Sequence, residues 1–408
     1  MLASKDCTGE SSAARAAARS RGPIRLDIDR RPWLQFQPLP WPWPELTLSA
    51  APSYAGKGRF RALARRRGGR VVNAASGGAC RSGPPSLAAV RALVADDLAR
   101  VDRTIDVNLA SSVALIPELA RHVTDAGGKR IRPLVTLLGA RAAGYEGDRH
   151  IELAAVIEFI HTATLLHDDV VDRSLERRGL QSANAIWGNA ASVLVGDFLF
   201  SQAFRLMVAD GSLPVLQLLS NAAAVIAQGE VLQLVTTGKT ATTEDEYLEV
   251  VRAKTAQLFA AAAAVGGHLV GYDPDVLAGL DRYGDQVGTA FQLTDDALDY
   301  LGESEETGKP TGGDFREGRL TLPVILAYAQ ADRKERDFWE RTLGKGQQAA
   351  GDFAEACTII RRRGTIAQTY QRAVACSDNA VTALDVLPPS RCRDALADLA
   401  RLASSRKH

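Results

Sequence analysis

Two stretches of the sequence carry acidic residues in the same arrangement: two adjacent aspartates, then a third aspartate three positions later. They read LLHDDVVD at 165–172 and FQLTDDALDY at 291–300. The first and third aspartates are four residues apart, so they share one face of a helix. Carboxylates this close repel each other, and burying them without a cation is costly. The spacing therefore predicts compensation by Arg173, Arg177 and Arg178 downstream, or by Mg²⁺, which favours carboxylate oxygens.

A single pattern of this kind arises on helix faces by chance, and the chain contains an example. DDLAR at 96–100 has the adjacent acids but an arginine in the fifth place, and it is interpreted as a solvated face with intrahelical ion pairs. Two complete copies, each after an apolar half-helix, are much harder to assign to chance. If the two helices face each other, six carboxylates converge, and several divalent cations would be needed to hold them. Such an arrangement suits a substrate phosphate.

Basic residues lie in stretches of their own. GGKRIRP at 127–133 places Lys129 and Arg132 in a glycine-flanked loop before a helix, where an anion is attracted, although a surface loop would look the same. Lys254 lies in an apolar-leaning helix, where a lysine usually extends to the surface. The glycine-rich stretch 307–323 lacks the residue order of a P-loop. Neither GxSxG nor HExxH is present, so nucleophilic catalysis finds little support.

The bulk composition excludes several classes of function. The formal net charge of +1 gives no reason to expect binding to nucleic acid or attraction to a membrane, and 46% apolar residues allow a sizeable core. Five cysteines without a CxxC spacing argue against a disulfide framework or a zinc site and favour a reducing compartment. No run of 18 apolar residues occurs, so we expect no membrane-spanning helix.

The elements that must position these residues are helices. Apolar residues recur at helical spacing from about residue 85 onward, starting after Ser86 as a predicted N-cap, and long alternating β-branched runs are absent. We therefore expect one all-α domain over 85–408. Besides the helix that begins at Ser86, helices are predicted at 151–166, 191–207, 215–233, 244–265, 275–300, 320–330 and 353–386.

Residues 1–84 differ from the rest of the chain. They hold 15 Lys/Arg against 5 Asp/Glu, and the proline-rich QPLPWPWPEL at 37–46 excludes regular helix. A disordered Arg/Pro-rich extension is the simplest interpretation. A transit peptide is an alternative, since Arg, Ala and Ser dominate residues 11–21, but Asp6 and Glu10 count against it. A start codon assigned too early is a third.

Taken in order, six motifs resemble those of the trans-type polyprenyl diphosphate synthases, long-chain members in particular. They are GGKRIRP, LLHDDVVD with ERRG, GDFLF, GEVLQL, KTAQLF, and FQLTDDALDY followed by GKPTGGDFREGRLTLP. The resemblance covers roughly residues 87–405, and Arg319 stands where the family more often has lysine. It implies the isoprenoid synthase type I fold, a bundle of long helices around a deep central cavity, in a homodimer. The implied reaction is head-to-tail condensation of isopentenyl diphosphate onto an allylic diphosphate.

The resemblance also implies roles for individual residues. About three Mg²⁺ per active site would be bound by Asp168, Asp169, Asp172, Asp295 and Asp299. The isopentenyl diphosphate site would comprise Lys129, Arg132, His161 and Arg178. The allylic diphosphate site would comprise Arg177, Lys254, Thr255, Gln292 and Lys309. Asp168, Asp172, Asp295 and Lys254 would carry the catalysis, because the leaving diphosphate departs only when its charge is neutralised.

Product length depends, in this family, on the residues just before the first acidic motif. Here they are Ala163 and Thr164, and Thr164 lies one helical turn, about 6 Å, from Asp168. Small side chains leave the cavity open, which predicts a long product of about C40 to C50 by resemblance, suited to a quinone side chain. Four further residues either form the floor of the cavity or belong to the core: Phe198, Phe200, Phe204 and Met207.

Two alternatives stay open. A class I terpene cyclase shares the first acidic motif but should lack GGKRIRP and carry an NSE-type second motif. An inactive regulatory subunit of a heteromeric synthase tends to lose one acidic motif, and this chain has both. We expect a cytoplasmic protein without a nucleic-acid partner or transmembrane segment. Peripheral membrane contact for product release and organellar targeting by residues 1–84 are left open.

Overall fold

The structure, a computed structural model, describes residues 86–125, 128–177, 179–272, 274–301 and 311–405. Helices make up nearly all of the regular structure in these ranges, which confirms the predicted all-α fold. A two-stranded antiparallel hairpin, β1 (Glu176–Arg177) and β2 (Leu180–Gln181), follows the first acidic motif. It is too short to form a layer of its own, so the bundle of helices determines the architecture.

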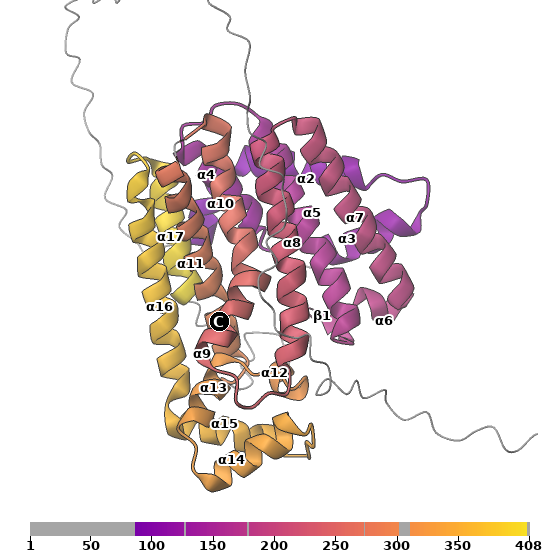
Figure 1. Cartoon of the computed structure of the whole chain (residues 1–408). Helices are drawn as coiled ribbons and strands as arrows, with labels where there is room; N and C mark the ends of the chain where they lie inside the picture. The colour runs from indigo at the N-terminus through magenta and orange to yellow at the C-terminus, as the bar shows by residue number, and fades with distance from the viewer. Residues whose placement is uncertain (1–85, 126–127, 178, 273, 302–310, 406–408) are drawn as a thin grey trace, which may run out of the picture. The chain divides into compact units, whose positions relative to one another are not determined.

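The bundle consists of long helices joined by short connections, with shorter helices at one end (Figure 1). The helices are α1 (Leu87–Ala92), α2 (Ala95–Leu109), α3 (Leu115–Asp125), α4 (Ile131–Ala142), α5 (Arg149–Val171), α6 (Ala183–Trp187), α7 (Asn189–Asp210), α8 (Leu213–Thr236), α9 (Glu244–Val251), η2 (Arg252–Ala256), α10 (Gln257–Val270), α11 (Pro274–Leu298), α12 (Gly313–Arg316), α13 (Leu322–Ala329), α14 (Arg333–Trp339), η3 (Glu340–Gly344), α15 (Asp352–Arg363), α16 (Thr365–Ala383), η4 (Leu384–Val386) and α17 (Arg391–Ser405).

The core is built around α10, which contacts α4, α5, α8 and α11. Its sequence QLFAAAAAVGGHLV is mostly alanine and glycine, so neighbouring backbones approach closely. A Cβ at Gly284 of α11 would lie only 2.2 Å from the carbonyl oxygen of Phe259, which leaves room for glycine alone. Helix α5 is buried along most of its length before the first acidic motif. The two motif helices thus belong to the rigid interior of the bundle.

Three predicted helices are interrupted in the structure. The helix expected after Ser86 breaks at Leu93–Val94 into α1 and α2, and the Ser86 side chain makes no capping hydrogen bond. The segment predicted over 244–265 contains the π-helical turn η2, which inserts one residue between α9 and α10. The segment 353–386 breaks at Gly364, whose φ of +66° ends α15. Apolar periodicity continues across each break, so periodicity alone did not reveal them.

The interpretation of DDLAR as a solvated face is only half right. Asp96 is exposed, and Arg100 lies 3.8 Å from Asp97 within the helix. Asp97, however, accepts hydrogen bonds from Arg141 of α4 at 2.8 and 3.1 Å and lies 3.1 Å from His150 of α5. This carboxylate therefore joins three helices, an interaction between elements that sequence spacing cannot show.

The sequence analysis predicted no membrane-spanning helix, yet α7 and α8 meet the length and composition of one. By length and composition alone, both are long and apolar enough to cross a membrane, and only 39% and 28% of their most apolar windows are buried. Both helices nonetheless contribute buried residues to the common core, including Leu199 and Ile226. Several of their other apolar side chains, among them Leu194 and Val231, are exposed.

Candidate active site

The first acidic motif lies at the C-terminal end of α5, and its outer aspartates share one face as predicted. Asp168 and Asp172 are each about one-seventh exposed, at 14% of the side chain. Each lies against a cation from a distant part of the chain: Lys254 Nζ is 3.2 Å from Asp168 Oδ2, and the Arg319 guanidinium donates to Asp172 Oδ2. Both carboxylates are therefore already organised around positive charge.

Asp169 points away from this face into the protein. Its side chain is fully buried and accepts hydrogen bonds from Arg177 of β1, with N–O distances of 2.8 and 2.7 Å to Oδ1. Burial raises the pKa of Asp169, and the Arg177 charge opposes that rise. The structure thus pairs a predicted metal ligand with a predicted allylic diphosphate ligand, and both roles stay predictions. Arg178 lies outside the described residues.

The second acidic motif ends α11, and its middle aspartate anchors a buried network. Asp296, 3% exposed, accepts a hydrogen bond from the Tyr247 hydroxyl of α9 and another from Gln292 Nε2 at 2.7 Å. Burial raises the pKa of Asp296 to about 6, against the effect of these hydrogen bonds. Gln292 Oε1 in turn accepts from the Thr255 hydroxyl at 3.0 Å. The network orients Gln292 and Thr255, two predicted allylic diphosphate ligands, while neighbouring Asp295 is partly exposed.

Asp299 has a structural function in the described residues. Its Oδ1 accepts from the backbone N–H groups of Gly312 and Gly313 at 3.0 and 3.1 Å, and its Oδ2 accepts from Asp314 N–H at 3.0 Å. The carboxylate thereby fixes the start of α12. Three donors use much of its lone-pair capacity, so its role as a metal ligand stays a prediction. Lys309, in the same loop, lies outside the described residues.

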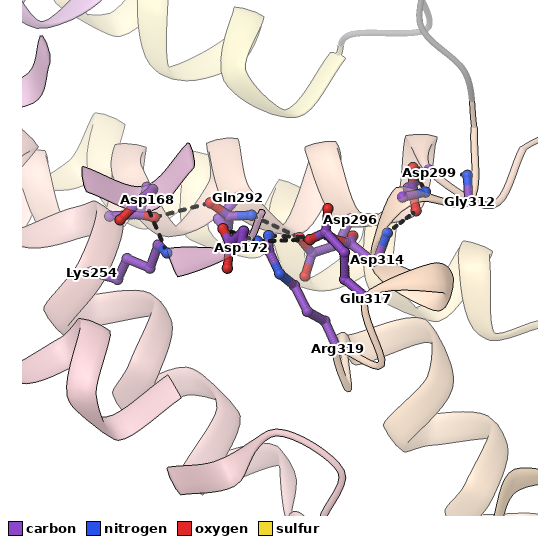
Figure 2. Close-up of polar contacts among 12 residues, drawn as sticks. Asp168, Asp172, Lys254, Gln292, Asp296, Asp299, Gly312, Asp314, Glu317 and Arg319 are labelled. Carbon is purple, nitrogen blue, oxygen red and sulfur yellow. Dashed lines mark hydrogen bonds and ion pairs between the residues drawn. The ribbon is translucent and has the colours of Figure 1, made fainter. Parts of the chain in front are cut away.

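Arg319 connects the first acidic motif to the segment that follows the second one. It follows α12 and makes ion pairs with Asp172 of the first motif, with Glu317 at 2.8 Å and with Asp314 at 3.7 Å. Figure 2 shows the row that results: Asp168 and Lys254 at one end, Asp299 and Gly312 at the other, and Asp172, Arg319 and Asp296 between them. Asp172 and Arg319, 147 positions apart in the sequence, thus meet in this row of charged residues.

Lys254 has a second carboxylate partner that the sequence analysis missed. Glu230 of α8 lies 2.6 Å from Lys254 Nζ, and burial together with the Asp168 charge raises the pKa of Glu230 to about 7. A Cβ at Gly229 would lie 2.8 Å from the Lys254 backbone nitrogen, so glycine permits α8 to approach η2. The GEVLQL motif contained this signal, because a glycine beside a glutamate inside an apolar helix requires a packing reason and a partner.

The predicted isopentenyl diphosphate residues lie around the loop before α4. The Arg132 guanidinium stacks 4.4 Å from the Phe259 ring centroid and donates to His161 Nε2 at 3.0 Å. Lys129 is exposed, and its carbonyl oxygen accepts from Arg91 of α1 at 2.8 Å. Arg132 and His161 are therefore brought together, and Lys129 lies in the loop just before α4. The prediction that Arg132 belongs to that loop is wrong, because Arg132 lies in the first turn of α4.

The two residues that are predicted to determine product length differ in burial. Ala163 is fully buried, whereas Thr164 is partly exposed and its hydroxyl donates to the His161 carbonyl oxygen at 2.7 Å. Of the residues offered as a floor, Met207 is buried in the core, and Phe204 is 45% exposed. Thr164 is thus the better candidate to contact a growing chain, and product length stays a prediction.

A divalent cation fits this site chemically. Among the described residues no three carboxylate, imidazole or thiol groups converge as a ready set of metal ligands. Instead, Asp168 forms an ion pair with Lys254, and Asp172 forms one with Arg319. The carboxylate oxygens are hard donors, which suit Mg²⁺. Asp168, Asp172 and Asp295 stay predicted ligands of such a cation.

The chain is similar to proteins of known activity. Residues 113–360 match the family model described as polyprenyl synthetase. Octaprenyl diphosphate synthase of Escherichia coli is 46% identical over 323 residues, covering 79% of this chain and 99% of the relative. All-trans-nonaprenyl-diphosphate synthase (geranyl-diphosphate specific) of Rhodobacter capsulatus is 41% identical over 318 residues, covering 78% and 97%.

Solved structures give the same result. The crystal structure of a decaprenyl diphosphate synthase from Rhodobacter capsulatus superimposes with a TM-score of 0.76 at 49% identity, covering 79% of this chain and 100% of that one. A polyprenyl synthase from Caulobacter crescentus, solved with calcium and isoprenyl diphosphate, gives a TM-score of 0.77 at 48% identity, covering 80% and 99%.

Proposed function

The chain belongs to the polyprenyl synthetase family and is a long-chain all-trans polyprenyl diphosphate synthase, and from this premise we propose how its site works. We propose that it condenses isopentenyl diphosphate head-to-tail onto an allylic diphosphate, with Mg²⁺ as cofactor, in the cytoplasm. A class I terpene cyclase and an inactive regulatory subunit are not favoured by the comparisons.

The observation that carries this proposal is the pairing of acidic motifs with cations from other elements. Asp168 lies against Lys254, and Asp172 lies against Arg319, which also approaches Asp314 beyond the second motif. Carboxylates alone would repel a diphosphate, whereas carboxylates that carry a metal beside a lysine and an arginine attract it. About three Mg²⁺, by analogy with the family, would be held by Asp168, Asp172 and Asp295, with Asp169 and Asp299 assisting.

The residues of the site assist cleavage of the bond between the allylic carbon and its diphosphate. Mg²⁺, when bound, neutralises the negative charge that develops on the departing diphosphate. Lys254, fixed by Glu230 at 2.6 Å, adds a cation, and Thr255 and Gln292 are oriented to donate or accept at fixed positions. The double bond of isopentenyl diphosphate attacks the allylic cation, and the proton then lost passes to the released diphosphate. The apolar helices exclude water that would quench the cation.

Isopentenyl diphosphate would bind at Lys129, Arg132 and His161, with Arg178 assisting. Arg132 is held between the Phe259 ring and His161, so little side-chain freedom is lost when it binds an anion. Because Thr164 is small, the chain is expected to grow to about C40–C50 before it is released, for attachment to a quinone.

We propose a homodimer through α7 and α8. Eight large apolar side chains on these helices are at least 37% exposed: Val193, Leu194, Phe204, Val208, Leu213, Val231, Leu234 and Val235. An apolar surface of this extent marks an interface, and a second copy of the chain supplies a self-complementary partner. Light scattering should give twice the 43.6 kDa of one chain. A mass of one chain, with binding to lipid vesicles, would instead assign this face to a membrane.

Product analysis tests the function. Purified protein is incubated with Mg²⁺, labelled isopentenyl diphosphate and farnesyl diphosphate, and the products are separated by length. Elongated products are expected with Mg²⁺ and not with chelator. If no elongated product forms under any of these conditions, the synthase proposal fails.

A further inference from the structure

Arg130 has an unusual backbone conformation. It directly precedes α4 and has φ +50° and ψ +37°, the left-handed region. In the described part of the chain only Arg173 shares a positive φ among residues other than glycine. A side chain makes this region unfavourable, so surrounding contacts must hold the residue there. The strained residue lies between Lys129, in the loop, and Arg132, in the first turn of α4.

Two carboxylates hold the Arg130 side chain. Its Nη1 donates to Glu158 Oε1 of α5 at 2.5 Å, and its Nε donates to Asp102 Oδ1 of α2 at 3.3 Å. The side chains of Arg130 and Glu158 are 13% and 8% exposed, so this is a nearly buried ion pair. Burial tends to lower the pKa of Arg130, but the charge of Glu158 raises it overall, and the guanidinium stays charged.

One face of α5 contacts both Arg130, which directly precedes α4, and Arg132, in the first turn of α4. Glu158 and His161 are three residues apart, so their side chains lie side by side on the helix. Glu158 binds Arg130, and His161 binds Arg132 at 3.0 Å. The ion pairs of Arg130 with Glu158 and Asp102, called the clamp here, therefore fix the backbone between Lys129 and Arg132. They thereby determine the directions in which these two side chains point. Nothing in this arrangement requires Arg130 to reach the substrate, because its guanidinium is occupied by carboxylates.

We propose that Arg130, clamped by Glu158 and Asp102, is a positioning residue that holds Lys129 and Arg132 in the geometry that binds the diphosphate of isopentenyl diphosphate. The inference rests on the proposed function of the site. It assigns a binding task to a residue that contacts no substrate. Its effect should fall on one substrate only, since the allylic diphosphate residues Lys254, Thr255 and Gln292 belong to η2 and α11.

A pair of variants isolates the backbone effect. In an E158Q background, which removes the buried countercharge, R130A and R130G both lack the guanidinium. Glycine adopts φ +50° without strain and alanine does not. We expect R130A/E158Q to raise the KM for isopentenyl diphosphate by about tenfold or more, and R130G/E158Q to recover a large part of that loss. The KM for the allylic substrate should stay within about twofold in both.

The control is another ion pair on α5. Arg149 binds Asp210 of α7 at 2.8 and 2.7 Å, far along the helix from the loop. R149A should lower the melting temperature and leave both KM values unchanged. If the R130 variants raise both KM values together, or if folded R130A/E158Q and R130G/E158Q bind isopentenyl diphosphate like the wild type, the positioning role is wrong. An inactive wild-type protein would instead refute the proposed function itself.

Discussion

Replacing Asp299 should destabilise the protein more than it affects metal activation, because its carboxylate fixes the start of α12. Three backbone N–H groups donate to it, from Gly312, Gly313 and Asp314. The Gly312 N–H also has the Asp299 carbonyl oxygen at 3.0 Å, so it keeps a partner when the side chain is removed. D299A therefore leaves two donors without their acceptor.

The magnitude follows from these two donors. Each unsatisfied buried donor costs about 1–3 kcal/mol, and partial exposure of Gly313 and Asp314 favours the lower end. We expect D299A to lose about 2–3 kcal/mol of unfolding free energy. D299N keeps one acceptor oxygen and presents an amide NH₂ to the Asp314 N–H, so it should lose about 1–2 kcal/mol.

The assay combines urea unfolding with Mg²⁺ titration of activity. For folded D299N, the Mg²⁺ concentration at half-maximal activity should change by less than about threefold, whereas D295N should need much more Mg²⁺. A D299A protein within about 0.5 kcal/mol of the wild type would refute the capping role. A D299N protein with unchanged stability and a large rise in required Mg²⁺ would show that Asp299 acts as a metal ligand instead.

Three further substitutions test the roles of Lys254, Thr164 and Glu335. K254M should lower kcat/KM for the allylic substrate by about 10²-fold or more, measured by steady-state kinetics, because a preorganised cation is lost. An unchanged kcat/KM would show that Lys254 does not bind the allylic diphosphate. T164F should shorten the product, as measured by chromatography, because an aromatic ring about 6 Å from Asp168 would block the growing chain. Unchanged product lengths would contradict the role of Thr164 in determining product length. Glu335 lies in α14. Burial tends to raise the pKa of its carboxyl group, but hydrogen bonds from Arg363 and Arg362 lower that pKa to about 2. Its contribution to stability is therefore complete above about pH 4.5 and lost as the pH falls toward 2, so the melting-temperature deficit of E335Q should shrink over that range; a deficit independent of pH would refute the ion-pair explanation.

Sequence spacing predicted the features that depend on one helix. The long helices occur close to where apolar periodicity placed them, and Asp168 and Asp172 share a face because they are four residues apart. The Thr255–Gln292 contact joins two residues that only the family resemblance had grouped. Within a helix, geometry is local and can be calculated from position alone.

Features that depend on how helices rotate against each other were not predictable. Asp169 is one position from Asp168, yet it is buried against Arg177. Asp299 reaches backbone donors thirteen or more positions later. The sequence shows neither orientation, because packing between elements decides both. Arg130 is the clearest case, since a left-handed arginine goes against local preference and exists only because Glu158 and Asp102 hold it.

We infer that the two acidic motifs and their cations form one site for chain elongation. Chromatographic product length, after incubation with Mg²⁺, labelled isopentenyl diphosphate and farnesyl diphosphate, is the decisive measurement. We expect Mg²⁺-dependent formation of an all-trans polyprenyl diphosphate of about C40–C50. Absence of any elongated product would contradict the site, and a predominance of C15 or C20 would contradict the open cavity above Asp168.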